Sequence, residues 1–300
     1  MIHLSRRRFL SISAACAALP TSAATAPTAR WRGTALGAAA SLRLEGLTDA
    51  QAAPIVNAIE TEVARLEGIF SLYRPESELS RLNRDGHLFA PAPELLTVLS
   101  LCTALHDASD GAFDPSIQPV WYALATGASA SEVRSAREAT GWHNVSIETA
   151  AIRLPQPGVS ALTLNGIAQG AITDRIAALL RSFDLHDVLV DMGEIAAMGQ
   201  RMDGRQWRVG LAGPEGSVQK HLSLRDRAVA TSAPEGTLLG SGQGHILNPN
   251  GSNPFHKTLS ISAPQAVIAD GLSTALCLVP HQQVDAVLRN FPDAKLELLI

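Results

Sequence analysis

Apolar residues recur every three to four positions over several stretches of this chain, which is the spacing of an amphipathic helix. The clearest repeat follows a capping box formed by Thr48 and Gln51. Its apolar face contains Ile55, Ile59, Val63 and Leu66. The same spacing predicts further helices over residues 92–108, 131–140, 166–183, 269–278 and 282–290.

Short apolar runs between turns rich in Gly, Asp and Pro predict strands. We expect them over residues 38–44, 187–199, 207–212, 220–229, 259–262 and 295–300, with a hairpin over 145–154. We find no internal repeat. The order of elements departs from the regular alternation of a doubly wound parallel sheet, so the sequence predicts an α+β fold.

The first residues have the pattern of a bacterial export signal. Residues 5–10, Ser-Arg-Arg-Arg-Phe-Leu, form a twin-arginine motif, and an Ala-rich run with small residues at 22–24 follows. We therefore expect a cleaved signal peptide over residues 1–26, a single domain over 27–300, and a periplasmic location. No other stretch reaches the roughly 18 apolar residues that a membrane span requires.

Composition indicates a globular protein that does not bind nucleic acid. Hydrophobic residues make up 46% of the chain and charged residues 17%, which supports a packed core. The formal net charge is −4 and no basic stripe carries interleaved aromatics. Cys102 and Cys277 lie in apolar runs, so we expect core thiols rather than a disulfide. Neither CxxC nor HExxH occurs, which argues against zinc.

The segment over residues 268–275 carries an acid and a hydroxyl four positions apart, Asp270 and Thr274. On a helix these positions share a face and offer two hard oxygens to one point, which suits Mg²⁺. Asp270 also fits a simpler role as the N-cap of the helix that follows. The pair alone does not distinguish these alternatives.

Five other segments carry candidate chemistry. Tyr73, in a polar loop, fits either stacking on a planar ligand or packing within its own loop. Residues 110–116 form a turn able to present backbone amides, and residues 164–170 start a helix whose N-terminus favours phosphates. Thr231 and Ser232 supply two hydroxyls after a strand. His245 lies in a tight turn and fits either a structural or a catalytic role.

In this order the segments resemble the ApbE family of periplasmic FAD:protein FMN transferases. The matching stretches extend over almost the whole chain after the signal peptide. They are residues 73–83, Gly111-Ala112-Phe113-Asp114-Pro115, Gly166-Ile167-Ala168-Gln169-Gly170 with Asp174, residues 190–194, Ala230-Thr231-Ser232, residues 245–249, and Ala269-Asp270 with Ser273-Thr274-Ala275.

The resemblance implies an ApbE-like (T-fold-related) α+β unit in which mixed sheets pack with helices around FAD. It also implies a Mg²⁺-dependent reaction that splits FAD, releases AMP and attaches FMN through a phosphoester to a Thr or Ser of an acceptor flavoprotein. The metal ligands implied are Asp270, Thr274, Ser273 and the carbonyl of Gly166. The FAD contacts implied are Tyr73, Ala112, Phe113, Asp114, Gln169, Thr231, Ser232 and His245, with His245 and Asp270 in catalysis.

Two positions depart from the family pattern. Gln169 stands where the family often has Lys and cannot supply its charge, and Leu36-Gly37-Ala38 replaces the usual Met-Gly-Thr. Two rival functions remain open: a Mg²⁺-dependent FAD pyrophosphatase that yields FMN and AMP, and a non-catalytic FAD-binding protein. The expected acceptor is a membrane-associated electron-transfer flavoprotein, with a nitrous-oxide-respiration protein as one candidate; contact with a membrane is expected only through it.

Overall fold

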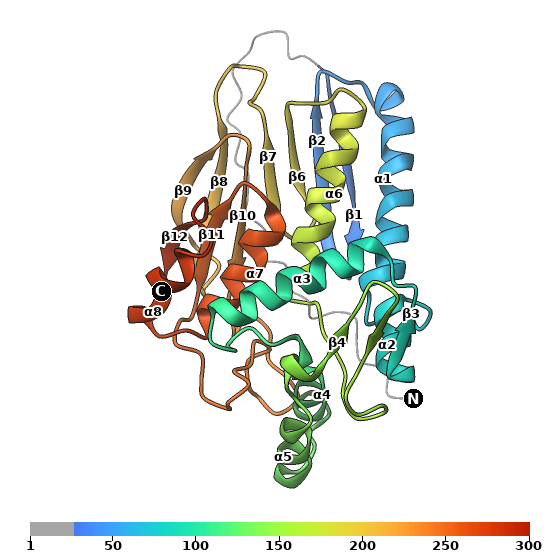
Figure 1. The fold of residues 1–300 in the computed structure, drawn as a ribbon. Coiled ribbons are helices and arrows are strands. Elements are labelled where there is room, and N and C mark those ends of the chain that lie inside the picture. Colours follow the sequence, from blue (N-terminus) through green and yellow to red (C-terminus); the bar gives the residue numbers. More distant parts are fainter. Residues whose placement is uncertain (1–26) are drawn as a thin grey trace.

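A seven-stranded sheet forms the centre of the computed structural model, which describes residues 27–300 (Figure 1). The predicted signal peptide over residues 1–26 lies outside the described residues. The strand order is β1-β2-β6-β7-β10-β11-β12, and every pairing is antiparallel. The strands are β1 (Thr28–Ala35), β2 (Ala38–Glu45), β6 (Val188–Asp191), β7 (Ile195–Met198), β10 (Arg227–Ser232), β11 (Leu259–Ala263) and β12 (Lys295–Leu299).

Three helices cover one face of this sheet: α1 (Asp49–Phe70), α6 (Ala168–Ser182) and α7 (Ala266–Cys277) (Figure 1). The apolar face of α1 packs into the same core as alternate residues of the strands. On β10, for example, Ala228 and Ala230 belong to this core, while Val229 between them belongs to a second one. The period of two along the strand thus divides its side chains between two layers.

The second layer is a hairpin of β8 (Trp207–Ala212) and β9 (Val218–Leu224) on the other face of the sheet. Trp207, Val209 and Leu211 of β8 pack there against Ile195 and Val229 of the main sheet. The indole N–H of Trp207 donates to the carbonyl of Met198 at 2.8 Å, which anchors the start of the hairpin. The hairpin therefore forms a wall beside the end of β10.

Most of the remaining elements lie at one end of the sheet, while the helix that follows α7 lies near the edge strand β12 (Figure 1). The remaining elements are α2 (Glu78–Asp85), α3 (Pro93–Ala108), α4 (Gln118–Thr126), α5 (Ala130–Glu138), α8 (His281–Leu288), two 3-10 helices (Pro115–Ile117 and Trp142–Asn144), and a small sheet of β3 (His87–Phe89), β5 (Ala151–Arg153) and β4 (Ser146–Ile147). The α+β prediction is confirmed.

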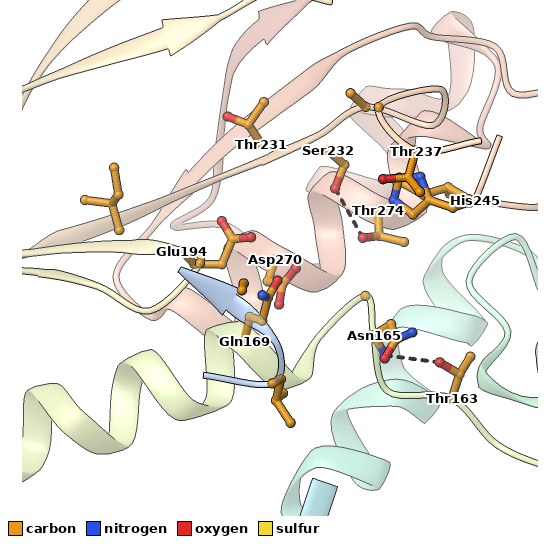
Figure 2. Close-up of a pocket in the computed structure, with 18 of the residues that line it drawn as sticks. Thr163, Asn165, Gln169, Glu194, Thr231, Ser232, Thr237, His245, Asp270 and Thr274 are labelled. Carbon is orange, nitrogen blue, oxygen red and sulfur yellow. Dashed lines mark hydrogen bonds between the residues drawn. The ribbon is translucent and has the colours of Figure 1, made fainter. Parts of the chain in front are cut away.

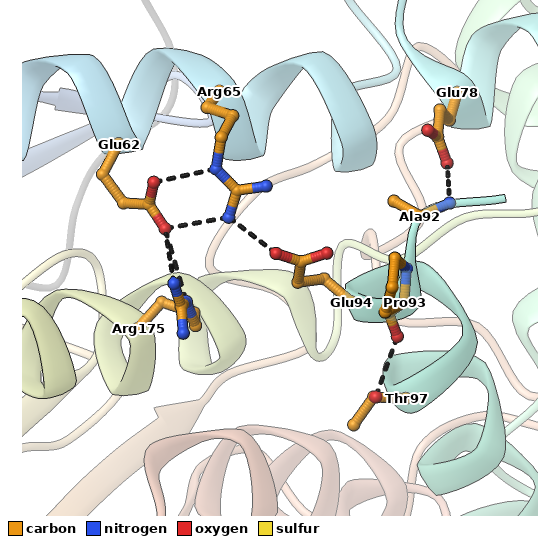
Figure 3. A network of polar contacts seen from close by, with 8 residues as sticks. All are labelled: Glu62, Arg65, Glu78, Ala92, Pro93, Glu94, Thr97 and Arg175. Atoms are coloured by element: carbon orange, nitrogen blue, oxygen red, sulfur yellow. Dashed lines mark hydrogen bonds and ion pairs between the residues drawn. The ribbon is translucent and has the colours of Figure 1, made fainter.

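An ion-pair network joins three helices on the surface (Figure 3). Glu62 of α1 accepts hydrogen bonds from Arg65 at 2.8 Å and from Arg175 of α6 at 3.0 Å, and Arg65 also reaches Glu94 of α3 at 2.7 Å. The two guanidinium groups lower the pKa of Glu62 from 4.5 to about 2, against a smaller opposing effect of burial. The network thus links α1, α3 and α6 by charge as well as by packing.

Most predicted elements are found within a few residues of their expected bounds, but the polar loop expected after α1 contains helix α2. Ser77 caps this helix by accepting from the amide of Ser80 at 3.1 Å, and Gly86 ends it with a φ of +73°. Leu79 and Leu82 are its two buried positions. Two apolar residues among charged neighbours give too short a period to detect.

Two predicted strands each proved to be a pair of strands. The stretch over 187–199 is a β6–β7 hairpin that turns at Gly193, whose φ is +102°. The stretch over 220–229 contains most of β9 and the start of β10, with a turn at Asp226, whose φ is +50°. Strand β1 and helix α4 had no predicted counterpart. The boundaries between β6 and β7 and between β9 and β10 were missed because each lies at a turn residue within a stretch that was predicted as one strand.

The cysteines of the described region, Cys102 and Cys277, are both free and buried in the core, as expected. Burial raises the pKa of both thiols, that of Cys277 to about 12. Across residues 27–300, none of the helices is both long enough and apolar enough to cross a bilayer.

Candidate active site

A cavity of about 640 Å³ opens where the ends of α6, α7 and β10 meet the β1–β2 turn and the β8 wall. Its lining comes from segments spread over more than 240 positions of sequence, from Arg32 to Leu278. In the view of Figure 2, Glu194, Asp270 and Gln169 gather on one side, with Ser232, Thr274, Thr237 and His245 on the other. The volume is sufficient for a dinucleotide-sized ligand.

Helix α7 presents Asp270 and Thr274 to the cavity from one face, as the spacing predicted. Asp270 is not an N-cap, because the helix begins four residues earlier at Ala266. That start is capped by another helix: the Asp174 carboxylate of α6 accepts the amides of Ala266 at 2.8 Å and Val267 at 2.9 Å. The capping interpretation of Asp270 is therefore wrong.

Asp270 is only 3% exposed, and its surroundings leave it with uncompensated charge. One carboxylate oxygen, Oδ2, accepts the amide of Gly170 at 2.9 Å, and Oδ1 has no hydrogen-bond partner among the described residues. Burial raises the pKa of Asp270 from 3.8 to about 7, and the neighbouring charge of Asp174 adds to the rise. A buried carboxylate without a basic partner favours a bound cation.

Thr274 and Gly166 are in direct contact. A Cβ on Gly166 would lie 2.8 Å from Thr274 Cγ2 and 3.0 Å from its Oγ1, so only glycine allows this approach. The carboxylate, the hydroxyl and the backbone at Gly166 thus border the same cavity. Ser273, the fourth predicted ligand, is fully buried and does not line it; its hydroxyl donates to the carbonyl of Asp270 at 3.0 Å.

These groups fit a hard divalent cation. A carboxylate, an alcohol and a carbonyl are the oxygen donors that Mg²⁺ accepts, and Asp270 carries the unpaired charge that such a cation would neutralise. Within residues 27–300, no three side chains of the His, Cys, Asp and Glu types are grouped to hold a metal. A cation at this position would therefore draw on neutral oxygens besides the Asp270 carboxylate.

The backbone amides near both predicted anion-binding turns are largely occupied. The amides of Ala112 and Phe113 donate to Ser109, and Asp114 uses Oδ1 to accept the amide and hydroxyl of Ser116. All three residues still line the cavity. The turn thus uses the amides of Ala112 and Phe113 to close itself, and these two amides are not free for a ligand.

The N-terminus of α6 shows the same effect. Ile167 and Ala168 both donate their amides to the carbonyl of Leu164, and the amide of Gly170 donates to Asp270. The anion at this helix end is thus the Asp270 carboxylate itself. The helix starts at Ala168 rather than at Gly166. The amide of Gly170, in its first turn, donates to Asp270 and favours the ionised form of that carboxylate.

Tyr73, Gln169 and Thr231 line the cavity as predicted. Tyr73 is 57% exposed, which favours the ligand-stacking interpretation over packing within its own loop. The Gln169 side chain lies against Gly193, where a Cβ would come within 2.6 Å of its Nε2. Thr231 and Ser232 lie within β10 rather than after it, and the Thr231 hydroxyl is bonded to Ser260 at 2.8 Å.

His245 lines the cavity, held by its backbone amide, which donates to the carbonyls of Pro234 and Thr237. Its ring atom Nδ1 is buried and has no hydrogen-bond partner. Burial lowers the pKa of His245 below its usual 6.5. The imidazole is therefore neutral at neutral pH and available as a base.

Glu194 is the residue that the sequence analysis left without a role. It lies 9% exposed in the cavity beside Asp270, and burial together with the charges of Asp270 and Asp191 raises its pKa well above the usual range. Asp191 also lines the cavity, and its pKa is raised by burial. Both belong to residues 190–194, one of the stretches that resemble the ApbE family. An isolated acidic residue beside a glycine turn does not by itself indicate a functional role.

The fold is that of known flavin transferases. The structure is similar to the flavin transferase ApbE from Vibrio cholerae, with a TM-score of 0.77 and 25% identity over 87% of this chain and 91% of that one. Among curated proteins, the FAD:protein FMN transferase of Treponema pallidum is 29% identical over 272 residues, which cover 76% of this chain and 75% of the relative. That of Salmonella typhimurium is 24% identical over 300 residues, covering 92% and 85%. A profile of the ApbE family matches residues 36–299, and the chain belongs to this family.

Proposed function

We propose that this chain is an FAD:protein FMN transferase, the enzyme class named for its relatives. In the reaction, an acceptor hydroxyl attacks the phosphorus of the FMN half of FAD. A phosphoester bond forms, the P–O bond to the AMP half breaks, and AMP leaves with the electron pair. The observation that carries the proposal is the Asp270–Thr274 pair meeting Gly166 in a cavity of dinucleotide size.

Mg²⁺ would be held by Asp270, Thr274 and the carbonyl of Gly166, and when bound it supplies charge neutralisation at the pyrophosphate. This chain's own residues do the remaining work. Tyr73 offers an aromatic face at the cavity wall. Neutral His245 takes the proton of the attacking hydroxyl, which its lowered pKa permits near neutral pH.

Two alternatives use the same residues. An FAD pyrophosphatase would admit water where the acceptor hydroxyl should enter, and a binding protein would hold FAD without turnover. The buried Asp270 argues against pure binding, because holding a flavin needs no unpaired carboxylate. The proposal also includes export by the twin-arginine route, which the motif at residues 5–10 supports. The proposed acceptor is an electron-transfer flavoprotein.

The test incubates the chain from residue 27 with FAD, Mg²⁺ and an FMN-accepting domain, followed by in-gel flavin fluorescence. Fluorescence on the acceptor supports the transferase, while free FMN and AMP with a dark acceptor support the pyrophosphatase. We expect Asp270→Ala to abolish turnover and Mg²⁺ dependence together. Full activity of that variant would remove the proposed metal site.

Whether His245 acts as the base is tested separately. His245→Ala should lose acceptor labelling by about 100-fold or more, as removal of a general base does, while FAD binding persists. Unchanged labelling would exclude this residue as the base and leave the enzyme class intact.

A further inference from the structure

Three hydroxyl groups form a chain behind the face of α7 that carries Thr274. Ser273 Oγ donates to the carbonyl oxygen of Asp270 at 3.0 Å. Ser232 Oγ of β10 lies 2.7 Å from Ser273 Oγ and 3.2 Å from Thr274 Oγ1. Figure 2 shows the last contact bridging from the strand to the helix. The distances leave open which oxygen donates in each of the two hydroxyl pairs.

The number of protons decides the direction. A carbonyl can only accept, so the three contacts are all hydrogen bonds only when the single proton of Ser273 points at Asp270 O. Ser232 must then donate to Ser273, which uses its own single proton. In the remaining pair Ser232 can only accept, and Thr274 donates. The proton of Thr274 is therefore directed at β10, and the lone pairs of its oxygen are left for the side that contacts Gly166.

The row of hydroxyl groups also prevents Thr274 from making a competing hydrogen bond within its own helix. A Thr in a helix commonly donates to the carbonyl four residues earlier, which for Thr274 is that of Asp270. Here the neighbouring Ser273 occupies that carbonyl instead. Thr274 therefore takes Ser232 as its acceptor across the two elements, and its side chain is held in the orientation that places Oγ1 beside Gly166.

We propose that Ser232 is a positioning residue: through this hydroxyl chain it fixes the orientation of Thr274, so that the threonine oxygen meets the cation with lone pairs and not with its proton. This inference rests on the proposed function, in which Asp270 and Thr274 hold Mg²⁺. It changes the role expected for Ser232. With its one proton committed to Ser273, Ser232 has no proton to donate to FAD.

Manganese binding to the FAD-free protein tests this without any turnover. We expect Ser232→Ala to bind Mn²⁺ about three- to ten-fold more weakly than the unaltered chain in calorimetric titration. Ser232→Thr keeps the hydroxyl and should restore binding. Ser260→Ala is the matched control. It removes a buried hydroxyl of the adjacent strand β11 that bonds Thr231 and has no part in the contacts among Ser232, Ser273 and Thr274.

A double-mutant cycle separates positioning from a general structural effect. Once Thr274→Val has removed the ligand, adding Ser232→Ala should cause no further loss of Mn²⁺ affinity. An equal loss in both backgrounds would overturn the inference. Ser273→Ala is the second variant: it frees Ser232 to donate toward Thr274, so it too should weaken Mn²⁺ binding.

The two proposals fail differently. If Ser232→Ala and Ser273→Ala bind Mn²⁺ as the unaltered chain does, the positioning role is wrong while the metal site stands. If the unaltered chain binds no Mn²⁺, or if Asp270→Ala binds it equally well, the proposed metal site itself is wrong. Thermal unfolding of each variant confirms that the protein titrated is folded.

Discussion

Gly170 of α6 packs directly against the backbone at the start of α7, and we expect Gly170→Ala to destabilise the protein. A Cβ at this position would lie 2.5 Å from the carbonyl oxygen of Ala266, 2.6 Å from Val267 Cα and 2.7 Å from Ala266 C. All three atoms are backbone, so no side chain can rotate away. An ordinary contact is roughly 3.5–4.0 Å, and the start of α7 would have to move by about 1 Å.

Opposing effects determine how much stability the protein loses in Gly170→Ala. Alanine in place of glycine favours a helix by up to about 1 kcal/mol. Overpacking against backbone costs about 1–3 kcal/mol. The same displacement stretches the bond from the Gly170 amide to Asp270, and a bond to a charged group contributes about 1.5–3 kcal/mol. The clash and the lost bond outweigh the propensity gain, so the net loss is about 1.5–5 kcal/mol.

The assay is thermal unfolding of the ligand-free protein followed by circular dichroism. At roughly 2–4 °C per kcal/mol for a domain of this size, the midpoint should fall by about 3–20 °C. Gly68→Ala is the matched control, because it lies inside α1 and a Cβ there meets nothing within 4 Å. It should raise the midpoint slightly. A Gly170→Ala protein as stable as Gly68→Ala would refute the packing argument.

Three further predictions concern buried or paired carboxylates. Glu62 has a folded pKa of about 2, below its unfolded value of 4.5, so it stabilises the protein above pH 4.5 and loses that effect as the pH falls toward 2. Denaturation curves of Glu62→Gln and the unaltered chain should thus converge in acid. Asp174→Ala should cost about 1–2 kcal/mol in urea unfolding, since it leaves two amides of α7 uncapped. Asp270 has a folded pKa raised to about 7, so metal-free Asp270→Asn should become more stable than the unaltered chain as pH rises from 4 through 7; a constant difference would contradict the assigned burial effect.

Periodicity predicted the long elements well because packing and local propensity agree there. The capping box at Thr48 and the apolar stripe of α1 both appear in the structure. Helix α2 was missed because two leucines give too short a period, and the β6–β7 turn was missed because Gly193 interrupts an apolar run that continues on both sides. Such boundaries depend on single positive φ angles, which composition does not reveal.

For the candidate site, spacing within one helix was enough to bring Asp270 and Thr274 to one face. The sequence could not show that Ser273, between them, faces inward and bonds a carbonyl. It also could not reveal the raised pKa of Glu194, which comes first from burial and then from the charges of Asp270 and Asp191. Which predicted residues line the cavity depends on how separate helices and strands pack together, and spacing along the sequence does not show this packing.

The cavity has a consequence for how the protein is made. Its walls come from the β1–β2 turn and from α7, which lie far apart in the sequence. A nascent chain in which α7 has not yet been synthesised has no Asp270 and no Thr274. The two side chains proposed to hold the cation therefore join the cavity only after the strands and helices that precede α7 have been made.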